Sequence, residues 1–318
     1  MRTGSQRGGI SRRLIVAGVG IAGLSGAAAG IYGIAPGFWR QYARDWQRPI
    51  VPPPARPNPA AWPDTGLYAA WLGHTTVLLK IDGFTILTDP VFSRRAGLNL
   101  GPLTLGVKRF VEPALAIREL PPIDLILLSH AHMDHLDVPS LRKLENRATM
   151  VVTAKSTSDL FRPDRYKETR ELGWEERTRV GPVTLKAFRV NHWGARMRSD
   201  TYRGYNAYTL EAGRYRILFG GDTASTDAFR GVRAVKPFDL AIMPIGAYNP
   251  WVYYHCTPEQ AWRMGGEARA EFFLPVHHQT FPLSREPVGE PIERFFGAAG
   301  NHPDRVAISR IGGQWRLA

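Results

Sequence analysis

From about residue 67 onward, short apolar runs alternate with turn residues, a pattern typical of β-strands. Val77–Ile81 and Phe84–Leu87 flank the pair Asp82-Gly83, which predicts a two-residue hairpin because both turn positions accept a positive φ. Asp124–Leu128 is a mainly apolar run, so it predicts a strand that is buried on both faces. Further strands are predicted at Val183–Val190, Tyr215–Phe219, Leu240–Met243 and Phe272–Val276.

Helical segments are predicted between these strands, at Pro139–Asn146, Ser156–Phe161, Pro258–Ala268 and Pro291–Phe296. The third begins with Thr257 as N-cap, Pro258 in the first turn and Gln260 three residues after the cap, which together make a capping box. Strands that alternate with helices, with hairpins among the strands, predict a layered α/β or α+β sandwich rather than an all-β barrel.

The N-terminal 36 residues are predicted to be a signal or membrane-anchor segment. Leu14–Ala35 holds no charged side chain and follows Arg12 and Arg13, and about 20 apolar residues suffice to cross a bilayer. Ser11–Ile15 resembles a twin-arginine export signal, and Ala27–Ala29 offers a small-residue cleavage site. A cleaved leader and a retained anchor both stay open. In either case we expect the rest of the chain to be exported, either facing the periplasm from a bacterial inner membrane or free in the periplasm.

Residues 37–63 are predicted to link this segment to the folded part of the chain. The first half carries Phe38, Trp39, Tyr42 and Trp46 among arginines, a mixture that suits a membrane interface, although an ordinary amphipathic connector would look similar. The second half is rich in proline, which favours an extended chain. The folded domain is therefore expected to span residues 64–318.

Composition limits the chemistry that this domain can use. The chain has 318 residues, enough for one large domain with a sizeable core. Its single cysteine, Cys256, excludes an internal disulfide and a cysteine-rich zinc site, so any metal must be held by His, Asp or Glu. The net charge of +13 favours an anionic surface or substrate, such as phospholipid headgroups or nucleic acid. Because the arginines are scattered along the chain, the pattern weakens the nucleic-acid alternative.

The most informative motif follows the strand Asp124–Leu128 directly and reads Ser129-His130-Ala131-His132-Met133-Asp134-His135. Three imidazoles and a carboxylate in six positions suit a divalent metal ion, because neutral imidazole and carboxylate are good zinc ligands. A single histidine is more often a surface or core residue. Here the groups would repel one another if protonated and would leave unpaired nitrogens if buried, so metal binding is the better interpretation.

The motif His130-x-His132-x-Asp134-His135 resembles the signature of the metallo-β-lactamase superfamily, and its surroundings most resemble the N-acylphosphatidylethanolamine phospholipase D-like branch. The resemblance covers residues 71–281 and rests on further segments as well: Trp71–Leu78, Leu87–Phe92, Leu136-Asp137, His192-Trp193 with Arg196, Gly220–Thr223 and Pro244–Tyr248. It implies a four-layer αββα sandwich, preceded here by the N-terminal hydrophobic helix, with two divalent metal ions, zinc by preference. Iron and manganese remain alternatives, since His and Asp ligands admit all three.

The resemblance implies two sets of metal ligands and one bridging ligand. His130, His132 and His192 would hold the first metal ion, and Asp134, His135 and His277 the second. Asp222 would bridge the two ions. The residues themselves support Asp222, because two glycines after the strand Tyr215–Phe219 allow a loop to point a carboxylate into a cleft. The last ligand is less certain, since His277 and His278 are adjacent. Alignment on Thr280-Phe281 favours His277.

Two metal ions would share a hydroxide and polarise the substrate, and metal binding lowers the pKa of water from near 16 to about 7. Asp134 and Asp222 are the candidate catalytic carboxylates that guide the proton. His255 is the third catalytic candidate; both it and His74 are weaker candidates, for which relatives place comparable histidines near the cleft. For each, a hydrogen-bonded core or loop histidine is the alternative. Carboxylates usually orient ligating histidines, and the candidates for this role are Asp89 and Asp137, either of which can instead be a turn or N-cap residue.

The resemblance implies a phosphodiesterase that acts on N-acylphosphatidylethanolamine-type phospholipids through a metal-bridging hydroxide. Trp251, Tyr253 and Tyr254 would form an apolar mouth for a membrane lipid, unless they belong to the core. The alternative is a metallo-hydrolase of another anionic or small substrate, such as a lactone, a β-lactam or a soluble phosphodiester. A nuclease or nucleic-acid-binding protein is disfavoured, since an exported protein meets little nucleic acid. Membrane association is expected through the N-terminus, and the oligomeric state stays open.

Overall fold

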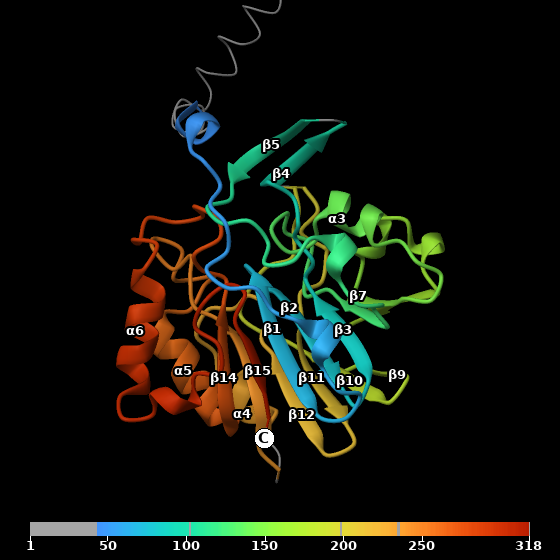
Figure 1. Ribbon diagram of the computed structural model, residues 1–318, viewed down its shortest axis with the longest axis vertical. Coiled ribbons are helices and arrows are strands. Elements are labelled where there is room, and N and C mark those ends of the chain that lie inside the picture. Colours follow the sequence, from blue (N-terminus) through green and yellow to red (C-terminus); the bar gives the residue numbers. More distant parts are fainter. Residues whose placement is uncertain (1–42, 102, 198, 234–235, 318) are drawn as a thin grey trace, which may run out of the picture. The chain divides into compact units, whose positions relative to one another are not determined.

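The alternating strands of the sequence fold into two β-sheets and a separate hairpin (Figure 1). The computed structural model describes residues 43–101, 103–197, 199–233 and 236–317, and every element below lies within them. Among these residues the first sheet has seven strands in the order β15-β1-β2-β3-β6-β7-β8. Their bounds are β1 (Leu67–Gly73), β2 (Thr76–Ile81), β3 (Phe84–Thr88), β6 (Leu125–Leu127), β7 (Met150–Ala154), β8 (Glu168–Leu172) and β15 (Gln314–Arg316).

The second sheet of the described chain has six strands in the order β14-β13-β12-β11-β10-β9. Their bounds are β9 (Arg177–Val180), β10 (Val183–Phe188), β11 (Ala207–Ala212), β12 (Tyr215–Phe219), β13 (Phe238–Pro244) and β14 (Ala270–Val276). The hairpin consists of β4 (Arg95–Leu100) and β5 (Leu103–Lys108). Strands β12, β13 and β14 are parallel, and β10 has the same direction because it is antiparallel to β11, which is antiparallel to β12.

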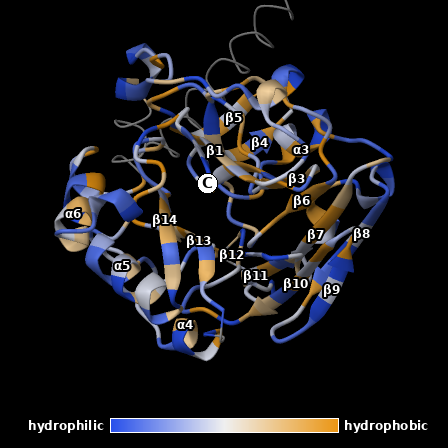
Figure 2. Cartoon of the chain, turned by 60° about the horizontal axis from the view of Figure 1, so that its bottom comes forward, coloured by the Kyte–Doolittle hydropathy of each residue, from blue (hydrophilic) through white to orange (hydrophobic). Residues whose placement is uncertain are grey.

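Helices cover the outer faces of both sheets. They are α3 (Val138–Lys143), α4 (Ala228–Gly231), α5 (Pro258–Glu267) and α6 (Glu290–Ala299). Leu141 of α3 packs on the outer face of the first sheet, whereas Met264 of α5 and Phe295 of α6 pack on the second. In Figure 2 the strands β6 and β7 are largely hydrophobic, whereas α5 and α6 mix hydrophilic and hydrophobic positions, as expected of surface helices. The arrangement is a mixed α/β sandwich, as the sequence predicts.

Strand β6 shows why the sheets stack in this way. Leu125 and Leu127 belong to the core between the two sheets, while Ile126 belongs to the cluster under α3. Successive side chains of a strand point to opposite faces, so a continuous apolar run is buried on both sides. This confirms the prediction for Asp124–Leu128. The hairpin at Asp82-Gly83 is also present, with Ile81 paired to Phe84.

One predicted helix is wrong and another is correct in detail. Ser156–Phe161 contains only the 3-10 turn Ser158–Leu160, because backbone N–H groups at the start of this segment donate to the carboxylate of Glu171 in β8. Helix α5 begins as expected: Thr257 accepts from the Gln260 N–H at 3.4 Å and its own N–H donates to Gln260 Oε1 at 2.9 Å.

The chain divides into two compact units, Met1–Arg48 and Pro49–Ala318. Residues 49–63, predicted as linker, therefore belong to the second unit, where Val51 pairs with Val111 and the Trp62 ring stacks on Tyr68 at 5.5 Å. Prolines keep this stretch extended, but Trp62 gives it an apolar contact with the sheet. The predicted N-terminal hydrophobic helix lies outside the described residues. In the part of the chain that is described, none of the helices is long and apolar enough to span a bilayer.

Candidate metal centre

The predicted ligands sit at the carboxyl ends of strands from both sheets. His130–His135 follows β6 in the first sheet, while His192, Asp222 and His277 follow β10, β12 and β14 in the second. Because these three strands of the second sheet run in the same direction, their loops meet at one end of the sandwich. The rigid strands thus hold the loops that carry the predicted ligands at fixed positions.

Gly221 makes the turn that directs Asp222 into the cluster. Its φ is +55°, a conformation that L side chains rarely adopt, and an added Cβ would lie 2.7 Å from the Asn206 carbonyl oxygen. No larger residue fits without displacing the backbone. Gly221 therefore makes the turn after β12 that the sequence predicts will direct Asp222 into the site.

The first group of potential ligands comprises His130, His132, His192 and Asp222, whose ligand atoms lie within 4.8 Å of one another. His132 Nδ1 is 2.8 Å from His130 Nε2 and 3.3 Å from His192 Nε2. Asp222 Oδ2 lies 4.0 Å from His130 Nε2 and 3.9 Å from His192 Nε2. Three imidazoles and one carboxylate thus converge from both sheets.

The second group comprises His74, Asp134, His135 and His277. His277 Nε2 is 3.3 Å from Asp134 Oδ2 and 3.1 Å from Asp222 Oδ2, and His135 Nε2 is 3.0 Å from the same oxygen of Asp222. Asp222 consequently lies against both groups, in the position that a bridging ligand requires. His74, a weaker candidate of the sequence analysis, contacts Asp134 through Nε2 at 3.0 Å.

Hydrogen bonds on the far side of several rings orient them toward the cluster. His135 Nδ1 donates to Asp89 Oδ2 at 2.7 Å, His130 Nδ1 donates to Ser129 Oγ at 2.8 Å, and His192 Nδ1 donates to the Tyr254 carbonyl at 2.9 Å. Each bond leaves the Nε2 atom of its ring directed at the other ligands. Such partners fix the tautomer and orientation of metal-binding histidines.

The two carboxylates proposed for this orienting role behave differently. Asp89 contacts His135 directly, and it also accepts from the hydroxyl of Ser129 at 2.6 Å. Asp137 instead occupies the N-cap position of α3 and accepts from the hydroxyls of Ser93 and Ser140. The N-cap alternative therefore holds for Asp137.

Burial and charge act in opposite directions on these side chains. Burial lowers the pKa of His132 to about 4 and holds the pKa values of His130 and His192 well below their ordinary value, so these rings are neutral at pH 7. Burial also disfavours charge on His277, but the carboxylates of Asp222 and Asp134 outweigh it and raise its pKa to about 9. At pH 7 His277 therefore carries a proton, whose charge balances the carboxylates of Asp134 and Asp222. A bound divalent cation would balance the same negative charge.

The residues fit a divalent metal ion by a second criterion. Asp222 Oδ1 is buried and has no hydrogen-bond partner, and the buried Nε2 atoms of His135 and His277 lie beside the clustered carboxylates without a hydrogen bond of good geometry. Buried polar atoms without a partner are costly and need an explanation, and metal coordination is one that suits imidazole and carboxylate. The donor set contains no sulfur, as the sequence predicts.

The placement of neighbouring histidines separates the alternatives left open by the sequence. His277 lies in the cluster, whereas the His278 ring stacks on Trp71 at 4.6 Å and belongs to neither ligand group. This geometry favours His277. His255 lies against the site from another side, with Nδ1 at 3.7 Å from Asp222 Oδ2 and a side chain that is 13% exposed. The cluster reaches solvent through His255, His132 and Asp134.

Two contributors were not identified from sequence in these roles. Arg196 donates from Nη1 to the carbonyls of Ala131 and Leu136 at 2.9 and 2.8 Å, so it clamps the histidine-rich loop from both ends. Thr75 Oγ1 lies 3.2 Å from His135 Nδ1. His74, Asp89 and His277 also have a positive φ, which is uncommon for residues other than glycine and places some backbone strain at the site.

The exposed aromatic residues near the site are not part of the core. Trp251 is 50% exposed, Tyr253 80% and Tyr254 45%, and the core alternative for them is wrong. Trp193 is 43% exposed, and its ring lies 4.9 Å from that of His132. An apolar rim therefore borders the solvent side of the cluster.

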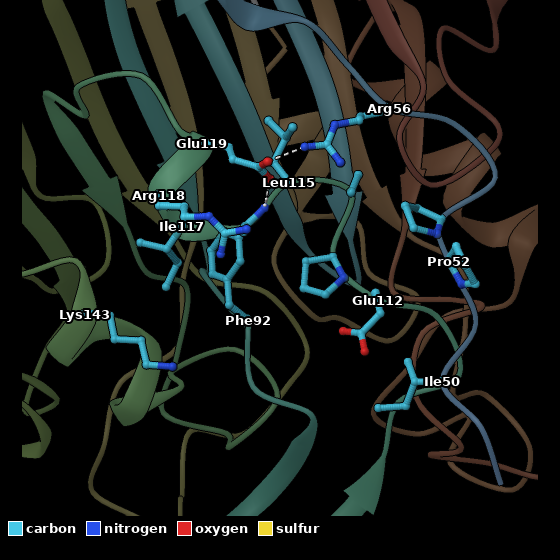
Figure 3. Close-up of a pocket in the computed structure, with 14 residues that line it drawn as sticks. Ile50, Pro52, Arg56, Phe92, Glu112, Leu115, Ile117, Arg118, Glu119 and Lys143 are labelled. Carbon is cyan, nitrogen blue, oxygen red and sulfur yellow. Dashed lines mark hydrogen bonds and ion pairs between the residues drawn. The ribbon is translucent and has the colours of Figure 1, made fainter.

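A cavity of about 690 Å³ lies apart from this site (Figure 3). Its wall combines apolar residues such as Phe92 and Leu115 with the ion pair between Arg56 and Glu119 and with Lys143 at its edge. None of the clustered histidines or carboxylates lines it. The cavity therefore has no part in the metal centre.

The amino-acid sequence is similar to that of a known protein family and of several individual proteins. Residues 85–278 match the family described as Beta-lactamase superfamily domain. An uncharacterized protein of Mycobacterium tuberculosis is 34% identical over 282 residues, which cover 85% of this chain and 74% of that protein. N-acyl-phosphatidylethanolamine-hydrolyzing phospholipase D 1 of Caenorhabditis elegans is 30% identical, with 69% of this chain and 66% of that protein covered. The mitochondrial N-acyl-phosphatidylethanolamine-hydrolyzing phospholipase D of Saccharomyces cerevisiae is 31% identical, with 77% and 55% covered.

Solved structures resemble this fold at low sequence identity. Igni18, a metallo hydrolase from Ignicoccus hospitalis, aligns with a TM-score of 0.60 and 16% identity over 80% of this chain and 99% of that one. CmlA, a diiron β-hydroxylase from Streptomyces venezuelae, aligns with a TM-score of 0.57 and 17% identity over 80% and 55%. These likenesses show a shared fold, and the second one shows that the fold hosts different chemistry.

Proposed function

The chain belongs to the metallo-β-lactamase superfamily of metal-dependent hydrolases, and from this premise we propose that it cleaves the phosphodiester bond of N-acylphosphatidylethanolamine-type phospholipids. The observation that carries the proposal is the pair of buried His/Asp groups on either side of Asp222. The choice of substrate is supported by the nematode and yeast relatives, whose names describe hydrolysis of this lipid and which are 30% and 31% identical to this chain.

Two divalent ions, zinc by preference, would be held by the two groups with Asp222 between them: His130, His132 and His192 for one, and Asp134, His135 and His277 for the other. When bound, such a pair supplies hydroxide from water near neutral pH and stabilises negative charge that develops on the phosphoryl oxygens. No serine or cysteine nucleophile is then required, and Cys256 is buried in any case.

The protein's own groups would handle the protons of the reaction. Asp134 and Asp222 are buried carboxylates whose pKa values the neighbouring histidines hold well below the ordinary value despite burial, so they are ionised and can accept a proton. The oxygen of water bonds to phosphorus, and the bond from phosphorus to the ethanolamine oxygen breaks. Burial lowers the pKa of His255 to about 4, so its ring is neutral at pH 7 and holds no proton of its own to give. We therefore assign His255 Nδ1, 3.7 Å from Asp222 Oδ2 at the exposed side of the site, to relay the proton that Asp222 takes from water to that leaving oxygen. The products are phosphatidate and an N-acylethanolamine.

The surroundings of the site suit a lipid. Trp193, Trp251, Tyr253 and Tyr254 are all exposed at 40% or more of their area, beside the side of the cluster that faces solvent. Aromatic side chains with a polar edge are common where proteins meet the bilayer interface. The proposal also locates the enzyme at a membrane or in the periplasm, for which the support is the uncharged sequence of residues 14–35.

The test is direct. The full-length protein, loaded with zinc, is incubated with N-acylphosphatidylethanolamine in mixed micelles, and released phosphatidate is measured by mass spectrometry. We expect turnover, and we expect Asp134→Asn to abolish nearly all of it while the protein remains folded. Absence of phosphatidate from a folded, metal-loaded protein would refute the substrate assignment.

A parallel panel tests the alternative substrates. Bis(p-nitrophenyl) phosphate, a set of lactones and a β-lactam are offered to the same preparation. If a lactone or β-lactam is hydrolysed and the lipid is not, the metal centre stands and the phosphodiesterase assignment falls. Retention on DNA that weakens with salt would instead favour a nucleic-acid substrate.

A further inference from the structure

The hairpin of β4 and β5 is the one sheet of the described residues that joins neither large sheet. In Figure 1 it extends beyond the body of the sandwich. Six residues per strand give it a length of roughly 20 Å. An isolated two-stranded hairpin is only marginally stable in water, so its persistence needs a reason.

The two faces of the hairpin differ in chemistry. Cross-strand partners alternate along it, and one face carries only apolar pairs: Ala96 with Val107, Leu98 with Leu105, and Leu100 with Leu103. The opposite face carries Arg95 with Lys108, Gly97 with Gly106, and Asn99 with Thr104. Because side chains alternate between the faces of a strand, the hairpin is amphipathic along its whole length.

The apolar face is covered at its base and bare toward its tip. Ala96 is buried and packs with Val91 and Phe281, and the Phe281 ring lies 5.2 Å from that of His74 in the candidate metal centre. Toward the tip, Leu98 is 40% exposed, Leu100 51% and Leu103 45%. The face that begins beside the metal centre thus continues into solvent as a row of leucines.

The strands of the hairpin are held unusually close in the middle. A Cβ added at Gly97 would overlap the Leu105 carbonyl oxygen, and one added at Gly106 would overlap the Ala96 carbonyl oxygen. Side chains larger than hydrogen are therefore excluded at this pair. The glycine pair thus permits the close approach of the two strands at the middle of the hairpin.

The charge within the hairpin segment is positive. Residues 90–111 contain Arg94, Arg95 and Lys108 and no aspartate or glutamate, while Arg109 is fully buried and takes no part in a surface contact. Arg95 and Lys108 stand opposite each other at the base of the hairpin, next to the body. Leucines at the tip and cations at the base follow the order of layers in an anionic bilayer, with acyl chains inside and charged headgroups outside.

We propose that the β4–β5 hairpin is a membrane-insertion element, whose leucines enter the acyl boundary of an anionic lipid bilayer while the basic residues at its base contact the headgroups. A second copy of the chain is a poorer occupant, because a stable interface needs roughly 800 Å² per partner and three half-exposed leucines on a narrow hairpin offer much less. The proposal does not rest on the proposed substrate, since insertion requires no turnover.

The test places a probe at the tip of the hairpin in the full-length protein. Cys256 is 1% exposed, so a cysteine introduced by Leu100→Cys can be labelled selectively with an environment-sensitive fluorophore. Vesicles of phosphatidylglycerol and phosphatidylcholine are added, with and without brominated acyl chains. We expect the emission to rise and move to shorter wavelength, and brominated lipid to quench it.

The matched control is Arg214→Cys, an exposed position in the turn between β11 and β12, at the end of the sandwich away from the metal centre. Its label should stay in water even when the N-terminal segment attaches the protein to vesicles. Adding Leu98→Asp and Leu103→Asp to the labelled Leu100→Cys protein should abolish quenching, with hydrolysis of bis(p-nitrophenyl) phosphate unchanged.

Three results would overturn the proposal. The first is a hairpin label that remains in water on vesicle-bound protein. The second is a response of this label no larger than that of the Arg214→Cys control. The third is a label already shielded before vesicles are added, in protein whose mass by light scattering is that of a dimer. Insertion without any lipid hydrolysis would support the hairpin proposal and contradict only the substrate assignment.

Discussion

At the scale of single residues, His135 illustrates how the site is made rigid. Its Nδ1 is fixed by Asp89, which Ser129 also contacts, and its Nε2 lies 3.0 Å from Asp222. The side chain is fully buried, so it cannot exchange these partners for water. Asp89 therefore acts on any bound ion through the imidazole that it orients.

We predict that Asp89→Asn weakens metal binding by about 10- to 100-fold, because an amide orients the His135 ring less firmly and lowers its basicity. The measurement is competition of the purified protein with a zinc indicator at equilibrium. Asp124→Asn is the matched control, since Asp124 accepts a backbone hydrogen bond from Thr85 at the far end of β6. Equal affinities for wild type and Asp89→Asn would contradict the role given to Asp89.

A second prediction concerns His255. If its Nδ1 protonates the leaving oxygen, His255→Ala should slow hydrolysis of an alkyl phosphodiester by about 100-fold or more. Hydrolysis of bis(p-nitrophenyl) phosphate should fall much less, because nitrophenolate leaves without a proton. Metal content, measured by mass spectrometry, should not change. The exposed His302→Ala serves as control. Loss of metal, or equal loss on both substrates, would instead indicate a ligand or a structural residue.

At the scale of elements, loops are fixed to their neighbours by a few specific contacts. Arg196 holds both ends of the histidine-rich loop through two carbonyl oxygens. Helices α5 and α6 are joined in a similar way on the outer face of the second sheet, where Arg294 makes a bidentate pair with Glu259 at 2.8 Å for both bonds. Such forks add geometric definition to helix packing.

The α5–α6 pair makes a prediction about pH. The hydrogen bonds from Arg294 lower the pKa of Glu259 to about 2, below its unfolded value of about 4.3. A depressed folded pKa stabilises the protein above the unfolded pKa, and this contribution is lost as pH falls toward 2. Because both side chains are more than a third exposed, screening limits the effect to about 0.5 kcal/mol.

The measurement is urea unfolding of wild type and Glu259→Gln at pH 6 and pH 3. Wild type should be the more stable at pH 6, and the difference should shrink at pH 3. The double variant with Arg294→Gln isolates the pairwise part. A difference that is the same at both pH values would show that the pair does not act through ionisation of Glu259.

At the scale of the whole molecule, the candidate metal centre joins the two sheets. His130 and His135 come from the first sheet, whereas His192, Asp222 and His277 come from the second. A ligand that binds only this arrangement stabilises the fold by about 2.7 kcal/mol at a hundred times its dissociation constant. Metal binding and the stability of the sandwich are therefore linked.

We predict that removal of metal by a chelator lowers the melting temperature by about 5 °C or more, given about 2 °C per kcal/mol for a domain of this size. Differential scanning calorimetry before and after chelation measures the shift, and added zinc should restore it. Asp222→Asn should show a much smaller shift in the same experiment. A chelated protein that melts like the untreated one, with no metal in either, would contradict the metal centre.

The sequence by itself determined the strands with strong local patterns, the capping box of α5 and the identity of the clustered residues. These features depend on neighbours within a few positions, where side-chain periodicity and turn chemistry are decisive. It predicted a helix at Ser156–Phe161 wrongly, because the competing hydrogen-bond partner of this segment, Glu171, lies in β8. It also expected the linker to run from residue 37 to residue 63, since the strand residue Tyr68 on which Trp62 stacks is not visible locally.

Only the tertiary structure decided which histidines share a site. His277 and His278 are equivalent in chemistry and adjacent in sequence, but the strand end of β14 directs one to Asp222 and the other to Trp71. In the same way, no local pattern marks the leucines of β4 and β5 as exposed, and only the fold leaves them without a sheet to cover them. Direction and burial are properties of the assembled sandwich, because they depend on residues far apart along the chain.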